Sequence, residues 1–282
     1  MGGAKRFLWL VCLLAAFAAA AGEAQDLPRG QVRLSADTLT YDPESRLVRA
    51  EGSVHLEREG MDLKAGFAEG DPAGERFRAW GPVKVRWPVQ KMELSAQEAS
   101  LVERGSRKVV ASGQVVLTRP QERLAASELE WVFGPVPEYV ARGAVVAEMP
   151  GRRLEAREAG RKGDLFWAAG VSRFEERTEG ISLKAGRIEA RSEGQEMREL
   201  TATGEVSAIV ERAGEPTVTL KGDKLLYSKA KGTVALVGNA QALQEGRSVK
   251  SETLLYDVTS RRIEAQGRPQ LVFTPSKENK AP

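Results

Sequence analysis

The stretch LSADTLTYDPESRLVRAEGSV, residues 34–54, contains the two motifs that decide the fold. Its first part, Leu34–Tyr41, has the form Leu-x-Ala-x-x-Leu-x-Tyr. Its last part, Ala50–Val54, is a small residue, any residue, glycine, any residue and an apolar residue. Between them, Asp-Pro-Glu-Ser at 42–45 has the composition of a turn. The stretch therefore predicts two segments that are joined by a turn and carry different motifs.

Both motifs recur along the chain, which indicates a repeat protein. The glycine motif is centred on glycines 27 to 34 residues apart: Gly52, Gly81, Gly113, Gly143, Gly170, Gly204, Gly238 and Gly267. The other motif falls between the glycines and begins at Leu34, Leu63, Leu94, Leu124, Leu154, Leu183, Leu220 and Val249. Eight repeats, or repeat units, result, and they are expected to stack because one repeat cannot bury its apolar face alone.

Within a unit the apolar residues alternate with polar ones. In Arg46–Glu57, Ala50, Val54 and Leu56 share one side of the chain with Gly52. This period of two is typical of strands with one apolar and one solvated face, whereas no stretch has a convincing helical period. Each unit is therefore predicted to be two antiparallel strands, which makes roughly 16 strands in an all-β chain.

The recurring glycines predict where the strands bend. Glycine inside a strand marks a bulge, a bend or a close backbone approach. Because it recurs once per unit, it would fold the sheet along a crease into two facing sheets with an apolar interior. A parallel β-helix is the competing geometry, but its coils usually need fewer residues and carry stacked asparagine or aliphatic ladders that this sequence lacks.

The first 24 residues predict a secretory signal. A basic pair, Lys5-Arg6, precedes the apolar run Phe7–Ala21, and a small-residue cleavage pattern ends at Ala24. Cleavage there makes Gln25 the first mature residue and discards the one cysteine, Cys12. The alternative is an uncleaved inner-membrane anchor, although 15 apolar residues are short for a span of about 20. We expect repeats in 25–150 and in 151–273, as two halves or one continuous module. Residues 274–282 are a predicted disordered tail.

Composition narrows the classes of function. With 41% apolar and 29% charged residues, the 282-residue chain fits neither a polytopic membrane protein nor a disordered one. One histidine and one cysteine leave almost no ligands for a transition-metal site and no disulfide framework. The net charge is only +3, and the basic residues do not cluster along the sequence, so nucleic acid is not an expected partner. We expect no metal and no cofactor.

The sequence carries no catalytic motif of the common kinds. It lacks a G-x-S-x-G elbow, a phosphate-binding loop and an H-E-x-x-H pair, and no carboxylate pair stands out among its evenly spread acids. We therefore expect a protein that is not an enzyme. Two alternatives stay open: a non-catalytic β-repeat scaffold, and a solenoidal polysaccharide-degrading enzyme.

The motifs resemble those of the OstA/LptA family of periplasmic lipopolysaccharide-transport proteins. The resemblance is carried by Ala36-Asp37-Thr38-Leu39-Thr40-Tyr41-Asp42 followed by Ala50-Glu51-Gly52-Ser53-Val54. Gly222–Tyr227 before Gly238, and Ser251–Asp257 before Gly267, are similar. The resemblance covers residues 34 to about 273 and is loosest at 151–177.

This resemblance implies an open, twisted antiparallel β-jellyroll whose two sheets splay into an apolar groove for lipid A acyl chains. It implies a periplasmic location and a passive role in carrying lipopolysaccharide from the inner to the outer membrane. The implied partners are lipopolysaccharide, the inner-membrane transporter complex and the outer-membrane translocon. Further copies of the chain would bind head to tail through edge strands.

The apolar positions of the motifs supply the candidate groove residues. Many interior positions are alanine or glycine, which leave room between the sheets for lipid chains. The larger candidates are Leu39, Tyr41, Val54, Leu56, Val115, Leu117, Leu129, Trp131, Leu225, Tyr227, Leu254 and Tyr256. Taken singly, each is also explained by plain core packing.

Basic residues near the motifs leave two interpretations open. They could contact lipid phosphates or form a solvated face: Arg29, Arg33, Lys64, Lys184, Lys221 and Lys250. The pairs Arg152-Arg153 and Arg161-Lys162 fall in the least regular unit and predict a loop or a hinge there.

Overall fold

The computed structural model describes residues 32–273, except 59, 72–75, 103–106, 134–135, 137, 178–179, 194–195, 212–213, 215, 258–259 and 261. The predicted signal segment 1–24 and the predicted tail 274–282 lie outside the described residues. In the described part, the regular elements are all β-strands, 18 in number. None of these residues belongs to a helix capable of spanning a membrane.

The described chain divides between Ala168 and Ala169 into two compact parts, each of several repeats, which we call the first unit and the second unit. The division falls inside one strand, β11 (Leu165–Glu176). The two halves predicted from the sequence, 25–150 and 151–273, remain a prediction.

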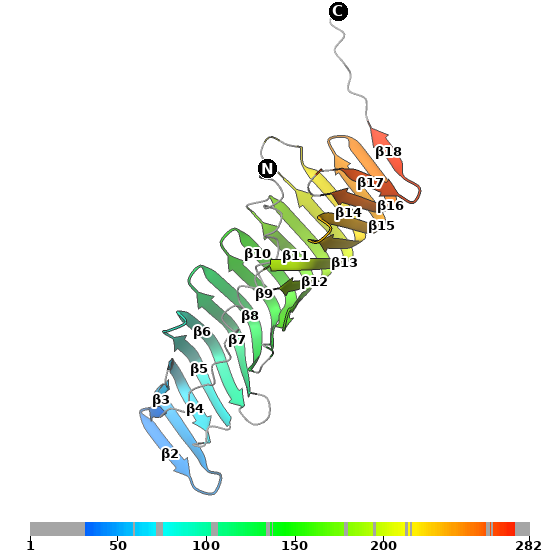
Figure 1. Cartoon of the computed structure of the whole chain (residues 1–282). Helices are drawn as coiled ribbons and strands as arrows, with labels where there is room; N and C mark the ends of the chain where they lie inside the picture. Colours follow the sequence, from blue (N-terminus) through cyan, green and yellow to red (C-terminus); the bar gives the residue numbers. More distant parts are fainter. Residues whose placement is uncertain are drawn as a thin grey trace, which may run out of the picture. The chain divides into compact units, whose positions relative to one another are not determined.

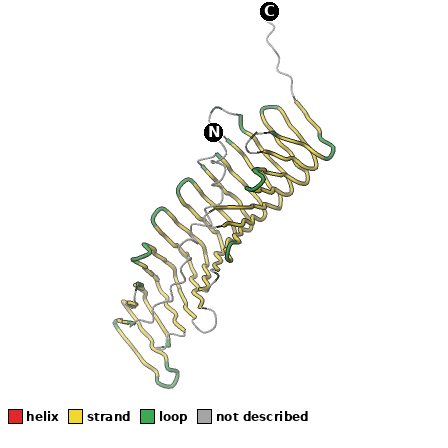
Figure 2. The backbone as a smooth tube through the Cα atoms, viewed as in Figure 1, coloured by secondary structure: helices red, strands yellow, loops and turns green. Residues whose placement is uncertain are grey.

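The first unit is an antiparallel meander (Figure 1). Each strand from β3 to β9 pairs with the strand that follows it, and β1 and β2 both pair with β3. Its strands are β1 (Arg33–Ser35), β2 (Thr38–Asp42), β3 (Leu47–Arg58), β4 (Met61–Gly70), β5 (Arg76–Trp87), β6 (Met92–Val102), β7 (Arg107–Arg119), β8 (Glu122–Phe133), β9 (Glu138–Met149) and β10 (Arg152–Lys162), together with the start of β11. In the described part, turns join β2 to β3, β5 to β6, β7 to β8, β9 to β10 and β10 to β11 (Figure 2).

The second unit repeats this plan. Strands β12 to β16 pair in sequence, and β17 and β18 both pair with β16. The strands are β12 (Ile181–Glu193), β13 (Glu196–Val210), β14 (Val218–Ser228), β15 (Thr233–Gln244), β16 (Arg247–Asp257), β17 (Ile263–Gln266) and β18 (Gln270–Phe273). The pairs β1/β2 and β17/β18 are each one strand interrupted midway. Counted so, the described strands number two per repeat, which confirms the predicted antiparallel β-repeat fold and excludes a parallel β-helix.

The glycine motif forms a bulge near the middle of β3, β5, β7, β9, β13 and β15. In β7, Gly113 and Gln114 have φ of 76° and 52° and together lie opposite one residue of β8, Ser127. On the other side they lie opposite Gln97 of β6. Ser127 and Gln97 each follow the Leu-x-Ala segment of their own motif. The two sequence motifs therefore meet at one line across the sheet, and we call this line the crease.

Contact across the crease explains why glycine is required. A Cβ on Gly113 would lie 2.7 Å from the Cβ of Gln97, and a Cβ on Gly143 would lie 2.5 Å from Oγ of Ser127. The second unit has the same arrangement, because a Cβ on Gly238 would lie 2.4 Å from Oδ2 of Asp223. In each case the facing side chain occupies the space that a larger residue would need.

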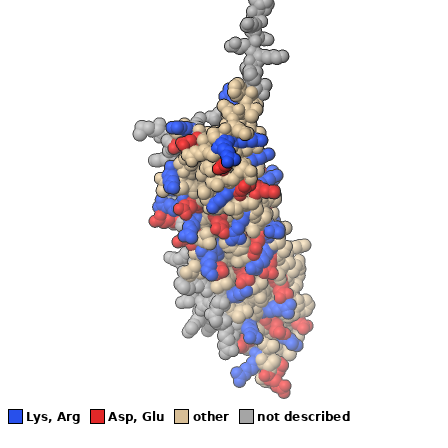
Figure 3. Space-filling model, turned by 90° about the vertical axis from the view of Figure 1, so that its right-hand side faces the viewer, with Lys and Arg blue, Asp and Glu red and all other residues tan. Residues whose placement is uncertain are grey.

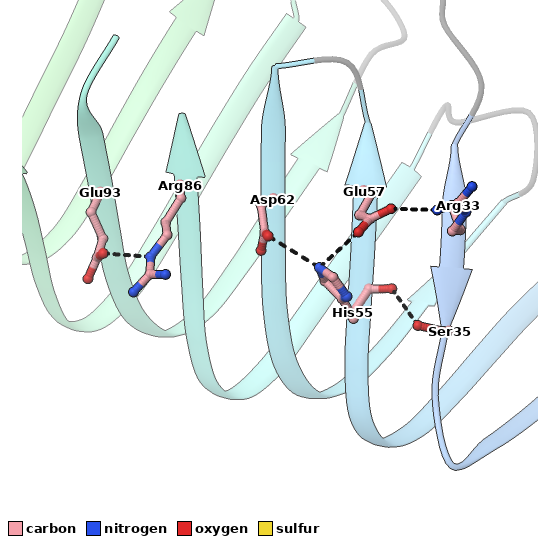
Figure 4. Close-up of polar contacts among 7 residues, drawn as sticks. All are labelled: Arg33, Ser35, His55, Glu57, Asp62, Arg86 and Glu93. Atoms are coloured by element: carbon pink, nitrogen blue, oxygen red, sulfur yellow. Dashed lines mark hydrogen bonds and ion pairs between the residues drawn. The ribbon is translucent and has the colours of Figure 1, made fainter. Parts of the chain in front are cut away.

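The crease divides each strand into two limbs, which turn toward each other. Figure 4 shows neighbouring strands of the first unit bending over in this way. The leucine limb contains the Leu-x-Ala segments; in β7 to β10 it comprises residues 115–119, 122–126, 145–149 and 152–156. The tyrosine limb comprises residues 107–112, 128–133, 138–142 and 158–162 in the same strands.

The interior lies between the limbs and is built of small and medium apolar side chains. Along β9, for example, Tyr139, Ala141, Val145 and Ala147 are at most 8% exposed. The residues between them are half-buried or exposed. The interior is therefore the apolar face that the period-two pattern predicts.

Candidate lipid-binding groove

Ten of the twelve candidate groove residues lie in the interior between the limbs. Eight are buried, with 1–8% of their surface exposed: Val54, Leu56, Val115, Leu117, Leu129, Leu225, Tyr227 and Leu254. Trp131 and Tyr256 are half-buried. Whether any of them contacts lipid stays a prediction.

The other two candidates are exposed. Leu39 and Tyr41 lie on β2 and are 51% and 56% exposed. The strand β2 pairs with β3 at the beginning of the first meander, and all five of its residues are exposed. The motif predicts correctly which face of the strand these two side chains occupy. At the beginning of the meander, however, that face of β2 is exposed.

A small hollow shows how the limbs face each other. It is lined by Leu117, Arg119 and Leu124 of the leucine limb and by Leu129, Trp131 and Tyr139 of the tyrosine limb. Its volume is about 10 Å³, which is the space of roughly one water molecule. This hollow between the described residues of β7 to β9 is therefore too small for an acyl chain.

Three lining residues of the hollow were not among the predicted candidates. Counting by two along the strands would have found them, because Leu124 begins a Leu-x-Ala segment, Tyr139 lies two residues before Ala141, and Arg119 lies two residues after Leu117. Burial raises the pKa of the Tyr139 hydroxyl well above its ordinary value, so this group stays protonated and able to donate a hydrogen bond.

Ion pairs run between neighbouring strands on the outer face. Arg78 Nε lies 2.8 Å from Oε1 of Glu98, and Nζ of Lys108 lies 2.6 Å from Oε1 of Glu130. Hydrogen bonds from these cations lower the pKa of Glu98 and of Glu130. Lys, Arg, Asp and Glu side chains are interleaved over the face drawn in Figure 3. Such a mixed surface offers no one-sign field for a polyanion.

The one histidine belongs to this outer face (Figure 4). Nε2 of His55 lies 3.3 Å from Oδ2 of Asp62 and 3.7 Å from Oε1 of Glu57, and Arg33 NH1 lies 3.1 Å from Oε2 of Glu57. Among the described residues, no group of three or more histidine, cysteine and acidic side chains could hold a metal ion.

Most of the basic residues proposed as phosphate contacts lie on the solvated face. Arg29 falls outside the described residues, and the exposed ones are Arg33, Lys64, Lys184, Lys221 and Lys250. Arg152 behaves differently, since it is only 8% exposed. The loop predicted at Arg152-Arg153 and Arg161-Lys162 is wrong: both pairs belong to β10, which pairs with β9 from Arg152 to Lys162. Arginines at positions that are apolar in other repeats hide the alternation in this sequence, although the strand is continuous.

The last strand of the second meander, β18, is exposed like β2 of the first meander. Leu271, Val272 and Phe273 of β18 are 63%, 63% and 59% exposed. Large apolar side chains on outermost strands favour pairing with another chain.

Comparison with known proteins finds similarity to one protein family over part of this chain. Residues 177–262 match the family described as LptA/(LptD N-terminal domain) LPS transport protein. This match confirms the resemblance to the OstA/LptA family over those residues. A solved structure, LptH from Pseudomonas aeruginosa, is described as the LptA-homologous periplasmic component of the conserved lipopolysaccharide transport device. It is 16% identical, covers 49% of this chain and 85% of its own, and superposes with a TM-score of 0.30. No curated protein matches the sequence.

Proposed function

We propose that this chain binds lipopolysaccharide by its acyl chains and forms part of a periplasmic bridge that carries it to the outer membrane. The match of residues 177–262 to a lipopolysaccharide-transport family supports this proposal. The observation that carries it is the creased sheet, whose limbs enclose a line of alanine, valine and leucine side chains in each unit. The role is passive, without cofactor or catalysis.

Lipid entry requires the two limbs to part. The hollow beside Trp131 has room for about one water molecule, and an acyl chain is far larger. The backbone ladders join neighbouring strands within a limb, so parting the limbs separates side chains and leaves these ladders intact. The acyl chain then packs against the apolar side chains that the limbs had buried against each other, at about 0.8 kcal/mol per buried methylene.

Assembly of the bridge would use the two ends of the chain. Both β2 and β18 expose large apolar side chains, and a strand from another copy would cover them: Leu39, Tyr41, Leu271, Val272 and Phe273. Because such a contact joins two different surfaces, it extends into a filament and does not close into a ring. The terminal copies would contact the inner-membrane transporter complex and the outer-membrane translocon, in the periplasm to which the predicted signal directs the chain.

A photo-crosslinking amino acid on β8 tests the proposal. It is placed at Trp131, which faces the interior, or at Val132, the next residue, whose side chain faces outward by alternation. The mature chain, 25–282, is produced in the periplasm of a lipopolysaccharide-making host and irradiated. A lipopolysaccharide adduct at Trp131 and none at Val132 is expected. Equal adducts at both positions, or none at Trp131, would contradict the proposal.

The small size of the hollow is the observation that favours the alternative, a periplasmic scaffold that holds no lipid. A scaffold would give no adduct at either position. The other alternative, a solenoidal polysaccharide-degrading enzyme, gains no support from a parallel β-helix, because the described strands pair antiparallel.

A further inference from the structure

The ends of the limbs away from the crease, which we call the open end, differ between repeats in their interior side chains. Two residues after the motif pair Val-x-Leu or Val-x-Ala, β7 has Arg119 whereas β9 has Met149. Two residues before the Leu-x-Ala segment, β10 has Arg152, whereas β4 and β6 have Met61 and Met92. The arginines thus take positions that other repeats give to methionine.

These arginines are buried in the structure, as the alternation of residues along each strand indicates. The side chain of Arg119 is 9% exposed, and Arg152 is 8% exposed as a residue. Arg119 lines the hollow together with Trp131 and Tyr139 of the opposite limb. The crease therefore brings a buried guanidinium and a buried phenol to the same apolar space.

A second arginine lies beside Tyr139 on the tyrosine limb. Trp131 and Arg161 are the register partners of Tyr139 on its two sides. The guanidinium of Arg161 lies 4.6 Å from the ring centre of Phe166, a fully buried residue. Arg161 is thus held at the boundary between the apolar interior and solvent, with Tyr139 between it and the hollow.

Acidic and weakly polar groups lie near both cations. Oε2 of Glu122 lies 3.9 Å from NH1 of Arg119, longer than a hydrogen bond. NH2 of Arg119 lies 3.5 Å from the sulfur of Met92, a weak acceptor. Arg161 Nε donates a hydrogen bond to the carbonyl oxygen of Gly163; burial lowers the pKa of Arg161, and the nearby carboxylate of Asp164 opposes this shift. Burial lowers the pKa of Arg119, and this direction reflects the cost of holding the cation away from water.

The cost of burying these cations favours a function for them over a purely structural role. Burying an ion pair is often no better for stability than apolar side chains of similar volume, which can even stabilise the fold. Methionine at the matching position of β9 shows that the fold accepts an apolar residue there. A buried guanidinium beside a hydroxyl is suited to an anion, because guanidinium binds phosphate through two parallel hydrogen bonds.

We propose that Arg119, Tyr139 and Arg161 form a phosphate site at the open end of the groove in the first unit. It would hold the phosphorylated head group of an acylated glycolipid whose acyl chains extend past Leu117 and Leu129 toward the crease. This inference rests on the proposed function, and it adds the orientation of the lipid and the part of the head group that is recognised.

The test compares three probes on the mature chain: diphosphorylated lipid A, the same lipid without phosphates, and inorganic phosphate. Arg119→Met is the main variant. Arg161→Met, at a half-buried residue, is the second because it poses less risk to folding. Arg123→Met is the matched control, since Arg123 lies on β8 with its side chain 47% exposed on the outer face.

We expect Arg119→Met and Arg161→Met each to weaken binding of the phosphorylated lipid about tenfold, as for loss of a charge-assisted hydrogen bond. Binding of the unphosphorylated lipid should change less than about twofold, and Arg123→Met should change neither. Equal losses for both lipids, or no loss for either, would overturn the phosphate site. Inorganic phosphate binding as tightly as the lipid would overturn the head-group assignment in favour of a free anion. If the wild-type chain binds neither lipid, the proposed function itself fails.

Discussion

Strands β7 to β10 of the first unit and β14 to β16 of the second share one backbone plan and differ in what lies at the open end. Both have the bulge at glycine, an apolar line between the limbs, and a facing residue after the Leu-x-Ala segment or its counterpart, which is Leu220–Gly222 in β14 and Val249–Ser251 in β16. The first set has Arg119, Arg152 and Arg161 at interior open-end positions. The second has Val218 where β10 has Arg152, and the buried Tyr227 and Val234. The shared features produce the fold, and the departures from the repeat indicate where a particular ligand is recognised.

The largest expected effect separates interior from exposed positions of one motif. Leu39, Leu129 and Leu225 hold the same motif position but are 51%, 5% and 8% exposed. Aspartate at either buried position places an unpaired charge in the interior and should cost about 4 kcal/mol or more. Leu39→Asp should change stability by less than about 0.5 kcal/mol. Urea unfolding measures all three, and a large loss for Leu39→Asp would show that β2 is covered in solution.

The next prediction concerns the crease. Gly113→Ala and Gly238→Ala should each destabilise the chain by about 2–4 kcal/mol, because φ is positive and the new Cβ meets a facing side chain. Gly60→Ala is the matched control, since Gly60 has φ of 74° but no atom within 4 Å of the added Cβ. It should lose only about 1–2 kcal/mol. Similar losses at all three sites would show that the facing side chain does not contribute to the loss of stability.

A smaller effect of opposite sign is expected at the open end. Arg119→Met removes a buried cation and installs the residue that β9 has at the same motif position. Combined with Glu122→Met, which removes the partner charge and installs the residue that β4 and β6 have at that position, it should raise the free energy of unfolding by about 1 kcal/mol, while binding of the phosphorylated lipid weakens. Calorimetry on the lipid-free chain measures the first change. A destabilised variant would mean that the ion pair with Glu122 holds the fold together.

The smallest effect concerns the outer face. Arg78 lowers the pKa of Glu98 in the folded chain, so the pair stabilises the fold at pH values above the ordinary range of the carboxyl. This contribution is lost as the pH falls through the lowered pKa. Glu98→Gln should therefore cost a few tenths of a kcal/mol at pH 7, since the pair is exposed, and nothing in strong acid. Unfolding at both pH values gives the comparison, and a cost that persists in acid would exclude the ion pair as its cause.

Much of the fold could be predicted from the sequence because spacing and alternation act locally. The crease followed from glycines such as Gly113, and the strand count followed from eight copies of the motif. Exposure of Leu39 could not be predicted, since period says which face a residue occupies and not whether a neighbouring strand covers it. The interior arginines were missed for a related reason. Arg152 and Arg161 look like solvated loop residues until the register with β9 places them on the apolar face.

The most direct test of the central claim is mass spectrometry of lipid bound to the mature chain, 25–282, purified from the periplasm of a lipopolysaccharide-making host. We predict lipid A species in stoichiometric amount on the wild-type chain and on Val132→Asp, which changes the outer face of β8. Trp131→Asp, in the interior, should lose the lipid while keeping its strand content by circular dichroism. A wild-type chain that carries no lipid and takes up none when lipopolysaccharide is added would contradict the transport account.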